Sequence, residues 1–401
     1  MKKIIIIGGG ASGMAAAVRA AENADNQITL LERQARVGRK LLATGNGRCN
    51  LMNMGAALPR YHGGDVSFAA PALEAYPPEQ VLEFFHGLGL KTVEEYGGRV
   101  YPASDHAASV LDVLRLALEK SNVEVVTGAA VESVKYRNGK FTVSWADGSA
   151  EADALIVACG GCAGSKLGGV TDGYTLLQSL CHSRTALHPA LTQIRTVPDY
   201  PKALKGIRTD AHVRLLRGET ELKNAKGDVL FTETGLSGTA IFEISRAAAT
   251  GGSGLTVSLG FTDEDEDTVL ADLRARRARW PQLAANMILT GAVQSRLGQM
   301  LCKSVGISGG DTVSDITDAR LAALAAALRD FRLPVTGVSG FEAAQVTAGG
   351  IQTSEFDPQT MQSRIVPGLY ACGEVLDIDG DCGGFNLQWA WASGLLAGEL
   401  R

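Results

Sequence analysis

Three glycines near the start of the chain constrain its fold more than any other feature. Gly8, Gly10 and Gly13 follow residues 3–7, which include four consecutive isoleucines and are typical of a buried parallel strand. In such a strand–loop–helix unit, the first glycine permits a tight turn, the second lets the backbone approach a pyrophosphate, and the third lets the helix pack on the strand. Ala11 and Ser12 then open a helix whose free N–H groups face the phosphates. The pattern predicts a Rossmann-type dinucleotide site.

An acidic residue at the end of the next strand narrows the choice of dinucleotide. Residues 27–32 form the expected second strand, which ends at Glu32 and is followed by Arg33. A carboxylate about 20 residues after the glycines can bind ribose hydroxyls, and it disfavours a 2′-phosphate. The sequence therefore favours FAD or NAD over NADP.

A second glycine-rich segment, near the C-terminus, favours FAD over NAD. An expected strand at 368–371 leads to acidic residues whose carboxylates can accept hydrogen bonds from a ribityl chain. Glycines then lead into a helix that begins near Asn386, and its N-terminus can stabilise negative charge at the N1–C2=O edge of a reduced isoalloxazine. The expected contacts in this segment are Gly373, Glu374, Asp377, Gly384, Phe385, Asn386, Leu387 and Gln388.

Hydrophobic periodicity outlines the other elements. We expect a helix at 12–23, mostly helices over 70–120, a β-meander over 123–157, short strands and turns over 190–260, helices over 263–332, and a final helix from about 386. No apolar stretch reaches the ~18 residues of a membrane span. The seven scattered cysteines form no disulfide framework, and they fit a reducing cytoplasm.

Several segments together resemble the bacterial NAD(P)/FAD-dependent oxidoreductases called aminoacetone-oxidase-like, within the glutathione-reductase-type flavoprotein superfamily. The resemblance spans nearly the full length, and its most specific match is the segment 38–50. Further matches lie at 98–102, 171–174, 231–232, 235–238 and 346–398. It implies an α/β fold in which a Rossmann-type, glutathione-reductase-like FAD-binding domain (1–190 and 340–401) carries an inserted domain at 191–339. We expect the insert to be β-rich over 191–260 and mainly helical over 261–339.

The resemblance also implies further FAD contacts. It places Val131 at the adenine and Gly160 and Gly161 at the end of a strand. In the loop it implies contacts by Arg39, Lys40, Asn46, Gly47, Arg48, Cys49 and Asn50. The chain departs from the family pattern at Glu233, where a histidine is expected, at Thr239, where a proline is expected, and at Cys159, where a threonine is expected. These departures put the expected substrate specificity in question and leave the expected cofactor unchanged.

The residue types in the loop leave two interpretations open. Arg39, Lys40 and Arg48 could neutralise charge on the pyrophosphate or at flavin N1, or they could lie on a solvated surface. Asn46 and Asn50 could donate hydrogen bonds to the ring edge or cap a turn.

Other candidate chemical groups also have two interpretations. Cys159 and Cys162 have the spacing of a redox disulfide, but the strand-end setting favours ordinary buried thiols. Cys49, beside Arg48, is a better candidate for a lowered thiol pKa, but structural packing is the favoured interpretation. Tyr61 and Tyr101 are possible proton donors. The six histidines lack metal-ligand spacing, so no metal is expected, and no catalytic residue is assigned.

These features predict hydride transfer through flavin N5 to or from a small organic substrate. No second glycine fingerprint occurs between 150 and 300, so NADH or NADPH would bind transiently, or electrons would come from the substrate itself. The family resemblance implies NAD(P)H-dependent reduction of a conjugated keto/ene compound, steroid- or bile-acid-like. The alternatives are an O2-using amine oxidase of aminoacetone type and a non-catalytic FAD-binding redox sensor. A net charge of −5 gives a nucleic-acid partner little support, and the oligomeric state stays open.

Overall fold

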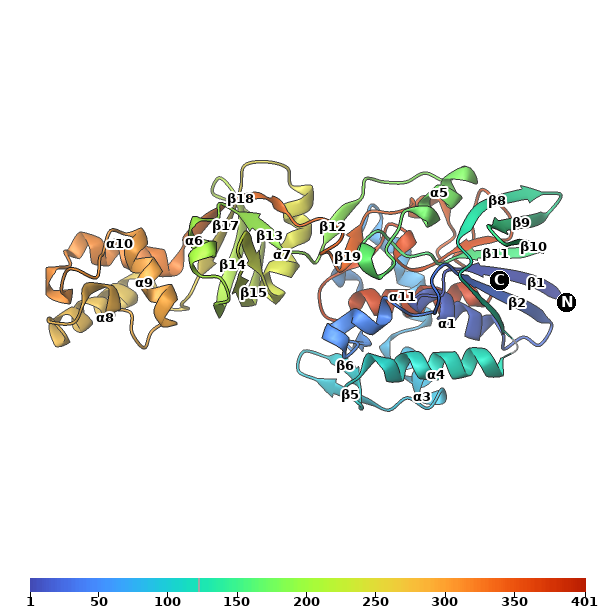
Figure 1. The fold of residues 1–401 in the computed structure, drawn as a ribbon, viewed down its shortest axis with the longest axis horizontal. Coiled ribbons are helices and arrows are strands. Elements are labelled where there is room, and N and C mark those ends of the chain that lie inside the picture. Colours follow the sequence, from blue (N-terminus) through green and yellow to red (C-terminus); the bar gives the residue numbers. More distant parts are fainter. Residues whose placement is uncertain (122) are drawn as a thin grey trace. The chain divides into compact units, whose positions relative to one another are not determined.

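The computed structural model describes residues 1–121 and 123–401, and the chain divides into two compact units. Unit 1 comprises Met1–His188 and Ala344–Arg401, and unit 2 comprises Pro189–Ala343. Unit 1 is therefore built from both ends of the chain, whereas unit 2 is one continuous insertion (Figure 1).

A five-stranded parallel sheet forms the centre of unit 1. Its strand order is β20-β11-β1-β2-β7. The bounds are Lys2–Ile7 for β1, Asn26–Glu32 for β2, Val123–Thr127 for β7, Ala154–Val157 for β11 and Leu369–Ala371 for β20. The strands β1 and β11 are buried over most of their length, as an all-apolar run predicts. The C-terminal strand β20 pairs with β11, so the sheet needs residues from both ends of the sequence.

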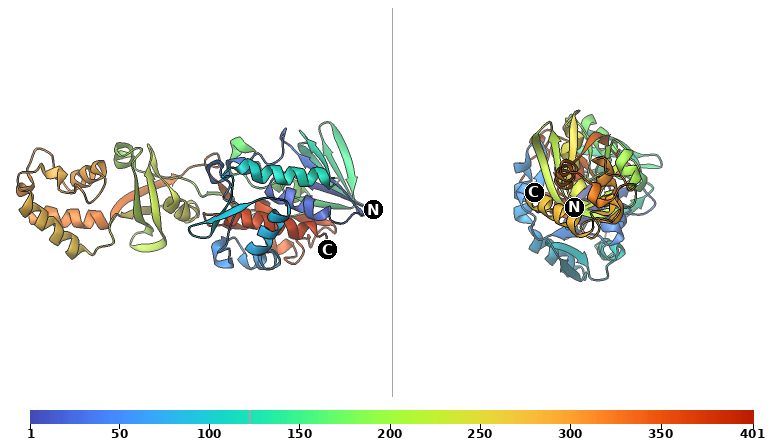
Figure 2. Two further views of the ribbon diagram at one scale, coloured as in Figure 1. Left: turned by 90° about the horizontal axis from the view of Figure 1, so that it is seen from below. Right: turned by 90° about the vertical axis from the view of Figure 1, so that its left-hand side faces the viewer.

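Two helices from opposite ends of the chain cross in close contact beside this sheet. They are α1 (Ala11–Ala20) and α11 (Phe385–Gly398), which lie side by side in both views (Figures 1 and 2). A methyl group on Gly394 would collide with the carbonyl of Ser12, and one on Gly398 would lie 2.6 Å from the carbonyl oxygen of Ala16. The small residues thus allow the two helix backbones to touch.

Smaller elements surround the central sheet of unit 1. The helices are α2 (Ala70–Ala75), α3 (Pro78–Gly87), α4 (Ala107–Lys120) and α5 (Asp172–Ser179). The three-stranded sheets are β10-β9-β8 (Gly148–Ala152, Lys140–Trp145, Val131–Arg137) and β3-β6-β5 (Met52–Asn53, Arg99–Pro102, Thr92–Glu95). The two-stranded ones are β21-β4 (Asp379–Gly380, Tyr61–His62) and β12-β19 (His188–Ala190, Val346–Ala348).

Unit 2 contains a closed barrel and a group of helices. The barrel order is β13-β16-β15-β14-β17-β18, with bounds Ile194–Thr196, Gly235–Ser237, Thr220–Phe231, Arg208–Arg217, Leu255–Gly260 and Phe331–Val338. The helices are α6 (Asp199–Ala203), α7 (Thr239–Thr250), α8 (Glu266–Arg279), α9 (Ser295–Ser304) and α10 (Asp318–Arg329). Within the unit, α8, α9 and α10 gather at one end (Figure 1).

The expected fold class, a Rossmann-type FAD-binding domain with an added β-rich part, is confirmed, but several local predictions need correction. Residues 123–127 were expected in the β-meander, yet β7 joins the parallel sheet beside β2, because the edge of a parallel sheet also shows half-buried alternation. The region 70–120 includes the strands β5 and β6 between its helices. The region 190–260 includes α7, whose buried Ile241, Ile244 and Ala248 follow helical spacing between two glycine clusters.

Candidate functional site

The carboxyl ends of the parallel strands bring the predicted cofactor residues of unit 1 to one edge. Gly8 follows β1, Glu32 ends β2, Gly160 and Gly161 follow β11, and Gly373 follows β20. In open α/β sheets, ligands bind at this edge where the chain changes direction between strands. Here β1 continues to β2 on one side and pairs with the later β11 on the other.

The three N-terminal glycines differ in what a side chain would meet. Gly8 has φ +109°, and a methyl group there would collide with the carbonyl of Ala158. One on Gly13 would collide with the carbonyl of Gly8, so glycine allows α1 to pack directly against the loop. In contrast, a methyl group on Gly10 would have no atom within 4 Å. The loop therefore leaves open space above its middle glycine, where a pyrophosphate approaches in this fingerprint.

Glu32 is buried and held at the glycine loop by the backbone. Its Oε2 accepts a hydrogen bond from the N–H of Gly9 at 2.8 Å, and its Oε1 accepts one from the N–H of Gln34 at 2.7 Å. Each carboxylate oxygen has a second lone pair, so both can still accept from ribose hydroxyls. The neighbouring Arg33 is exposed and pairs with Asp172 at 3.1 Å.

The acid that follows β20 makes its contacts within the protein. Glu374 pairs with Lys40 Nζ at 2.8 Å, and its other oxygen accepts from the N–H of Thr347 at 2.7 Å. The N–H of Gly161 also donates to Glu374 at 3.3 Å. This ion pair ties the loop at 38–50 to the strand ends, and the expected contacts of Lys40 and Glu374 with a cofactor stay predictions.

The other two cations of this loop also have protein partners. Arg39 is exposed and donates to the Gln34 side chain at 2.9 Å. Arg48 lies over the Tyr101 ring, 4.1 Å from its centroid, and pairs with Glu95 at 2.5 Å and with Asp105. Two carboxylates thus already offset the Arg48 charge.

Residues near the end of this loop have positive φ angles. Asn46 and Gly47 have φ of +57° and +88°, and a methyl group on Gly47 would have no atom within 4 Å. Asn50 places a buried Oδ1 without a hydrogen-bond partner among the described residues. A buried acceptor of this kind is costly unless something donates to it, so its orphaned oxygen fits a ligand with an N–H or O–H group.

The thiol in this loop is packed in the protein interior, as the favoured interpretation predicts. Burial raises the pKa of Cys49 to about 11, although a hydrogen bond with Thr44 lowers it slightly. Cys49 is therefore an inert packed thiol, because the neighbouring guanidinium of Arg48 is directed toward Glu95 and Asp105 and does not stabilise a thiolate. Burial also raises the pKa of Cys159 to about 12 and raises that of Cys162, and both are free thiols, in agreement with the ordinary interpretation.

The start of α11 forms the C-terminal part of the site. Gly384 has φ +104°, and a methyl group there would lie 2.9 Å from the orphaned Oδ1 of Asn50 and would also collide with Met52. Phe385, Asn386 and Leu387 form the first turn, whose N–H groups lie at the positive end of the helix dipole. The glycine therefore brings this helix end next to the loop at 38–50.

The polar side chains at this helix end mainly fix the protein itself. Asn386 exchanges two hydrogen bonds of 2.8 Å with the backbone of Gly380 and donates to the carbonyl of Asp381 at 3.2 Å. Gln388 is buried and donates to the carbonyl of Tyr76 at 3.0 Å. Asp377 is buried and accepts from the N–H of Gly64 at 3.3 Å. Val131, the expected adenine contact, is a buried residue at the start of β8.

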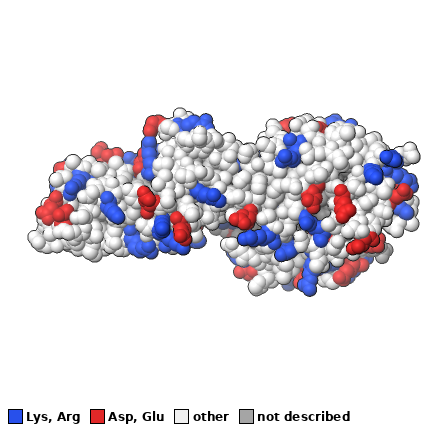
Figure 3. All heavy atoms as spheres, turned by 45° about the horizontal axis from the view of Figure 1, so that its top comes forward, with Lys and Arg blue, Asp and Glu red and all other residues white. Residues whose placement is uncertain are grey.

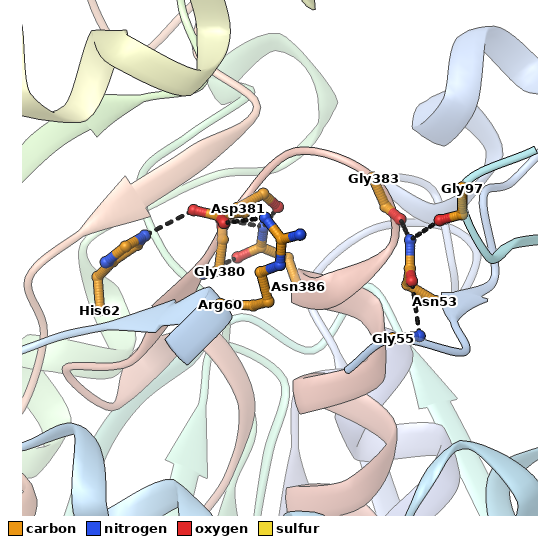
Figure 4. A network of polar contacts seen from close by, with 9 residues as sticks. All are labelled: Asn53, Gly55, Arg60, His62, Gly97, Gly380, Asp381, Gly383 and Asn386. Atoms are coloured by element: carbon orange, nitrogen blue, oxygen red, sulfur yellow. Dashed lines mark hydrogen bonds and ion pairs between the residues drawn. The ribbon is translucent and has the colours of Figure 1, made fainter. Parts of the chain in front are cut away.

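A polar network that the sequence reasoning missed lies beside this helix start (Figure 4). Asp381 Oδ1 bonds His62 Nε2 at 2.7 Å, and its Oδ2 pairs with Arg60 at 3.3 Å. Asn53 donates to the carbonyls of Gly97 and Gly383 at 3.1 and 2.9 Å. The interacting residues are far apart in sequence: the β4–β21 pairing brings His62 to Asp381, and the β3–β6 pairing brings Asn53 to Gly97.

The two tyrosines suggested as proton donors are poorly suited to that role. The hydroxyl of Tyr61 is buried and donates to the carbonyl of Phe385 at 3.3 Å, and burial raises its pKa well above the usual range. Burial also raises the pKa of Tyr101, whose ring lies under Arg48.

Taken together, the residues fit FAD. The open space at Gly10 suits a phosphate, and the carboxylate of Glu32 suits a ribose. The helix end at Gly384 suits the negative edge of a reduced ring, and the unpaired Oδ1 of Asn50 suits a ring N–H.

The described residues also bear on three other kinds of site: a metal site, a membrane span and a charged surface patch. Within residues 1–121 and 123–401, no cluster of three or more His, Cys, Asp or Glu could hold a metal ion. None of the described helices combines the length and the apolar character needed to cross a bilayer. On the face shown in Figure 3, Lys and Arg are interspersed with Asp and Glu in both units.

Comparisons with known proteins extend this description. A protein-family model described as the HI0933-like protein Rossmann domain matches residues 2–400. A 3-dehydro-bile acid delta(4,6)-reductase of Clostridium scindens is 41% identical over 406 residues, which cover 100% of this chain and 98% of the relative. A ribosomal RNA dihydrouridine synthase of Escherichia coli is 29% identical over 393 residues, covering 97% and 95%.

One solved structure shares the fold over the whole chain. It is a 3-ketosteroid delta1-dehydrogenase from Sterolibacterium denitrificans, with 11% identity and a TM-score of 0.52, covering 100% of this chain and 99% of that one. The narrower aminoacetone-oxidase-like name stays a prediction. The match over nearly every residue and the 41% identity show that the chain belongs to the HI0933-like family of FAD-binding Rossmann proteins.

Proposed function

We propose that this protein reduces a carbon–carbon double bond conjugated with a ketone, in a steroid- or bile-acid-like compound, with NADH or NADPH as the electron donor. The coarser prediction is confirmed: the chain is an FAD-dependent oxidoreductase. The observation that carries the finer proposal is the end-to-end 41% identity with a bile-acid reductase, in a chain whose glycine loop leaves open space at Gly10. The predicted amine oxidation has no comparable support.

The residues of unit 1 would hold the cofactor in a fixed orientation. The loop at Gly10 and the first turn of α1 would bind the pyrophosphate, and Glu32 would bind the ribose. When bound, FAD supplies hydride transfer at its N5 atom. The first turn of α11 would stabilise the negative charge that builds up at N1–C2=O. We further propose that residues 1–190 and 340–401 form the FAD-binding domain and that 191–339 form a substrate-side domain.

A second candidate substrate is a uridine in ribosomal RNA, because one relative at 29% identity is named for dihydrouridine synthesis. Both relatives' names describe the saturation of a double bond conjugated with a carbonyl, so the two candidates share their chemistry. The net charge of −5 favours the small molecule, since RNA binding depends mainly on cations that pair with phosphates.

A stopped-flow experiment distinguishes these activities. The FAD-loaded protein is mixed anaerobically with NADH or NADPH, and loss of the visible flavin absorbance is followed; free FAD serves as the control. The reduced protein is then mixed with a 3-keto-4,6-diene bile acid or with ribosomal RNA. We expect reduction by one nicotinamide and rapid reoxidation by the diene. Bleaching by a small amine but by neither nicotinamide would favour the oxidase and contradict the proposal. Reoxidation by the RNA alone would favour the second candidate.

A further inference from the structure

A histidine–aspartate pair lies directly beside the start of α11. His62 is in β4, which pairs with β21, and Asp381 follows β21 on the way to the helix. The side chain of Asp381 is only 8% exposed, whereas that of His62 is 27% exposed. The carboxylate is therefore buried while the imidazole still reaches solvent.

We propose that His62 is the proton donor of the reaction and that Asp381 positions it. This inference rests on the proposed function, since the reduction of a conjugated ketone requires one hydride and one proton. The hydride forms the new C–H bond at the β-carbon, and the double-bond electrons move toward the α-carbon and the carbonyl oxygen. The proton from the imidazolium forms the second C–H bond at the α-carbon. The neutral imidazole then takes up a proton from water, and the nicotinamide supplies the electron pair.

The contact with Asp381 distinguishes the two ring nitrogens of His62. Asp381 holds Nε2 at 2.7 Å, so the imidazole is oriented with Nε2–H toward the carboxylate, and its Nδ1 lies on the other side of the ring. Arg60, at 3.3 Å from Asp381, balances part of the negative charge. Asp379 is the register partner of His62 in the β4–β21 pair, so a second acidic residue lies on the strand opposite the imidazole.

Hydrogen bonds connect the His62–Asp381 pair to the helix start where the flavin ring is expected. The side chain of Asn386, in the first turn of α11, bonds the backbone of Gly380 and Asp381 (Figure 4). A ligand that contacts the first turn of this helix therefore lies next to Asn386, which holds the backbone of the residue whose carboxylate orients His62. The alternatives nearby are weaker, because Tyr61 is buried and bonded and Cys49 is a packed thiol.

The test compares the two half-reactions in His62→Gln and in His86→Gln. His86 is an exposed histidine of α3 that bonds Thr92, and it serves as the matched control. We expect both variants to be reduced by the nicotinamide at the wild-type rate. Reoxidation by the diene should be slower by about 10²- to 10⁴-fold in His62→Gln alone. In D2O, the wild-type product should carry deuterium at the α-carbon.

A second measurement is independent of turnover. Nitrogen chemical shifts of ¹⁵N-histidine-labelled protein without substrate report which ring nitrogen carries the proton. Neutral His62 should carry it on Nε2 in the wild type, and Asp381→Ala should remove this preference. Equal reoxidation of wild type and His62→Gln, or a proton on Nδ1, would overturn this inference alone. Failure of the diene to reoxidise the wild type would overturn the proposed function and this inference together.

Discussion

Replacing Gly10 with alanine should separate cofactor binding from folding. The backbone at Gly10 has φ −82° and ψ −167°, a conformation that alanine adopts readily, and the added methyl group meets no atom within 4 Å. Alanine leaves the unfolded chain less conformational freedom than glycine does, which stabilises the folded variant by about 0.4–1 kcal/mol. Alanine is also a poorer N-cap than glycine, which destabilises the folded variant by a similar amount. The free energy of unfolding without FAD should therefore change by less than about 1 kcal/mol.

The same methyl group lies where the pyrophosphate is expected to approach. Overpacking of a fitted site costs about 1–3 kcal/mol, which corresponds to a Kd for FAD that is about 5- to 160-fold weaker. FAD affinity is measured by titration of the FAD-free protein with calorimetry, and unfolding is followed in urea. Gly13→Ala is the contrasting variant: its methyl group collides with Gly8, so it should lose stability even without FAD. Wild-type FAD affinity in a folded Gly10→Ala variant would refute this account of the site.

Three further predictions concern the packing and charges of the two units. Gly394→Ala should lower the free energy of unfolding by about 1–3 kcal/mol in urea, because the methyl group collides with the Ser12 carbonyl in the α1–α11 contact; an unchanged midpoint would contradict that contact. At pH 8, iodoacetamide should label the exposed Cys181 long before Cys49, since burial raises the Cys49 pKa to about 11; mass spectrometry showing equal labelling would contradict it. Partial burial raises the pKa of Asp330, but hydrogen bonds from a serine and an arginine outweigh it and hold the value below 3.8. Asp330→Asn should therefore cost about 1 kcal/mol in urea at pH 6, and the cost should shrink as the pH falls below about 4; a constant cost would contradict the assignment.

The N-terminal half of the cofactor site follows from local patterns. Each glycine of the fingerprint has a distinct steric role, and the strand and helix around it have strong periodicity, so Gly8, Gly10 and Gly13 could be assigned from spacing alone. Glu32 could be placed because its distance from the glycines is nearly fixed by one βαβ unit.

The parts that could not be predicted depend on distant pairing. His62 and Asp381 are 319 residues apart, and neither has a sequence signal of its own, so only the β4–β21 register shows that they meet. The partners of a cation cannot be predicted from the sequence either: Arg48 pairs with Glu95 and Asp105, which are 47 and 57 residues away.

The order in which the chain leaves the ribosome has a consequence for this protein. Strand β20 and helix α11 come from the last part of the sequence, yet they complete the sheet and contact the first helix. The barrel of unit 2 consists of a continuous stretch, so it can close during synthesis, while the first strands wait for their neighbours. A nascent chain should therefore bind the dinucleotide only after α11 has been synthesised, and a variant that lacks this helix should bind no FAD.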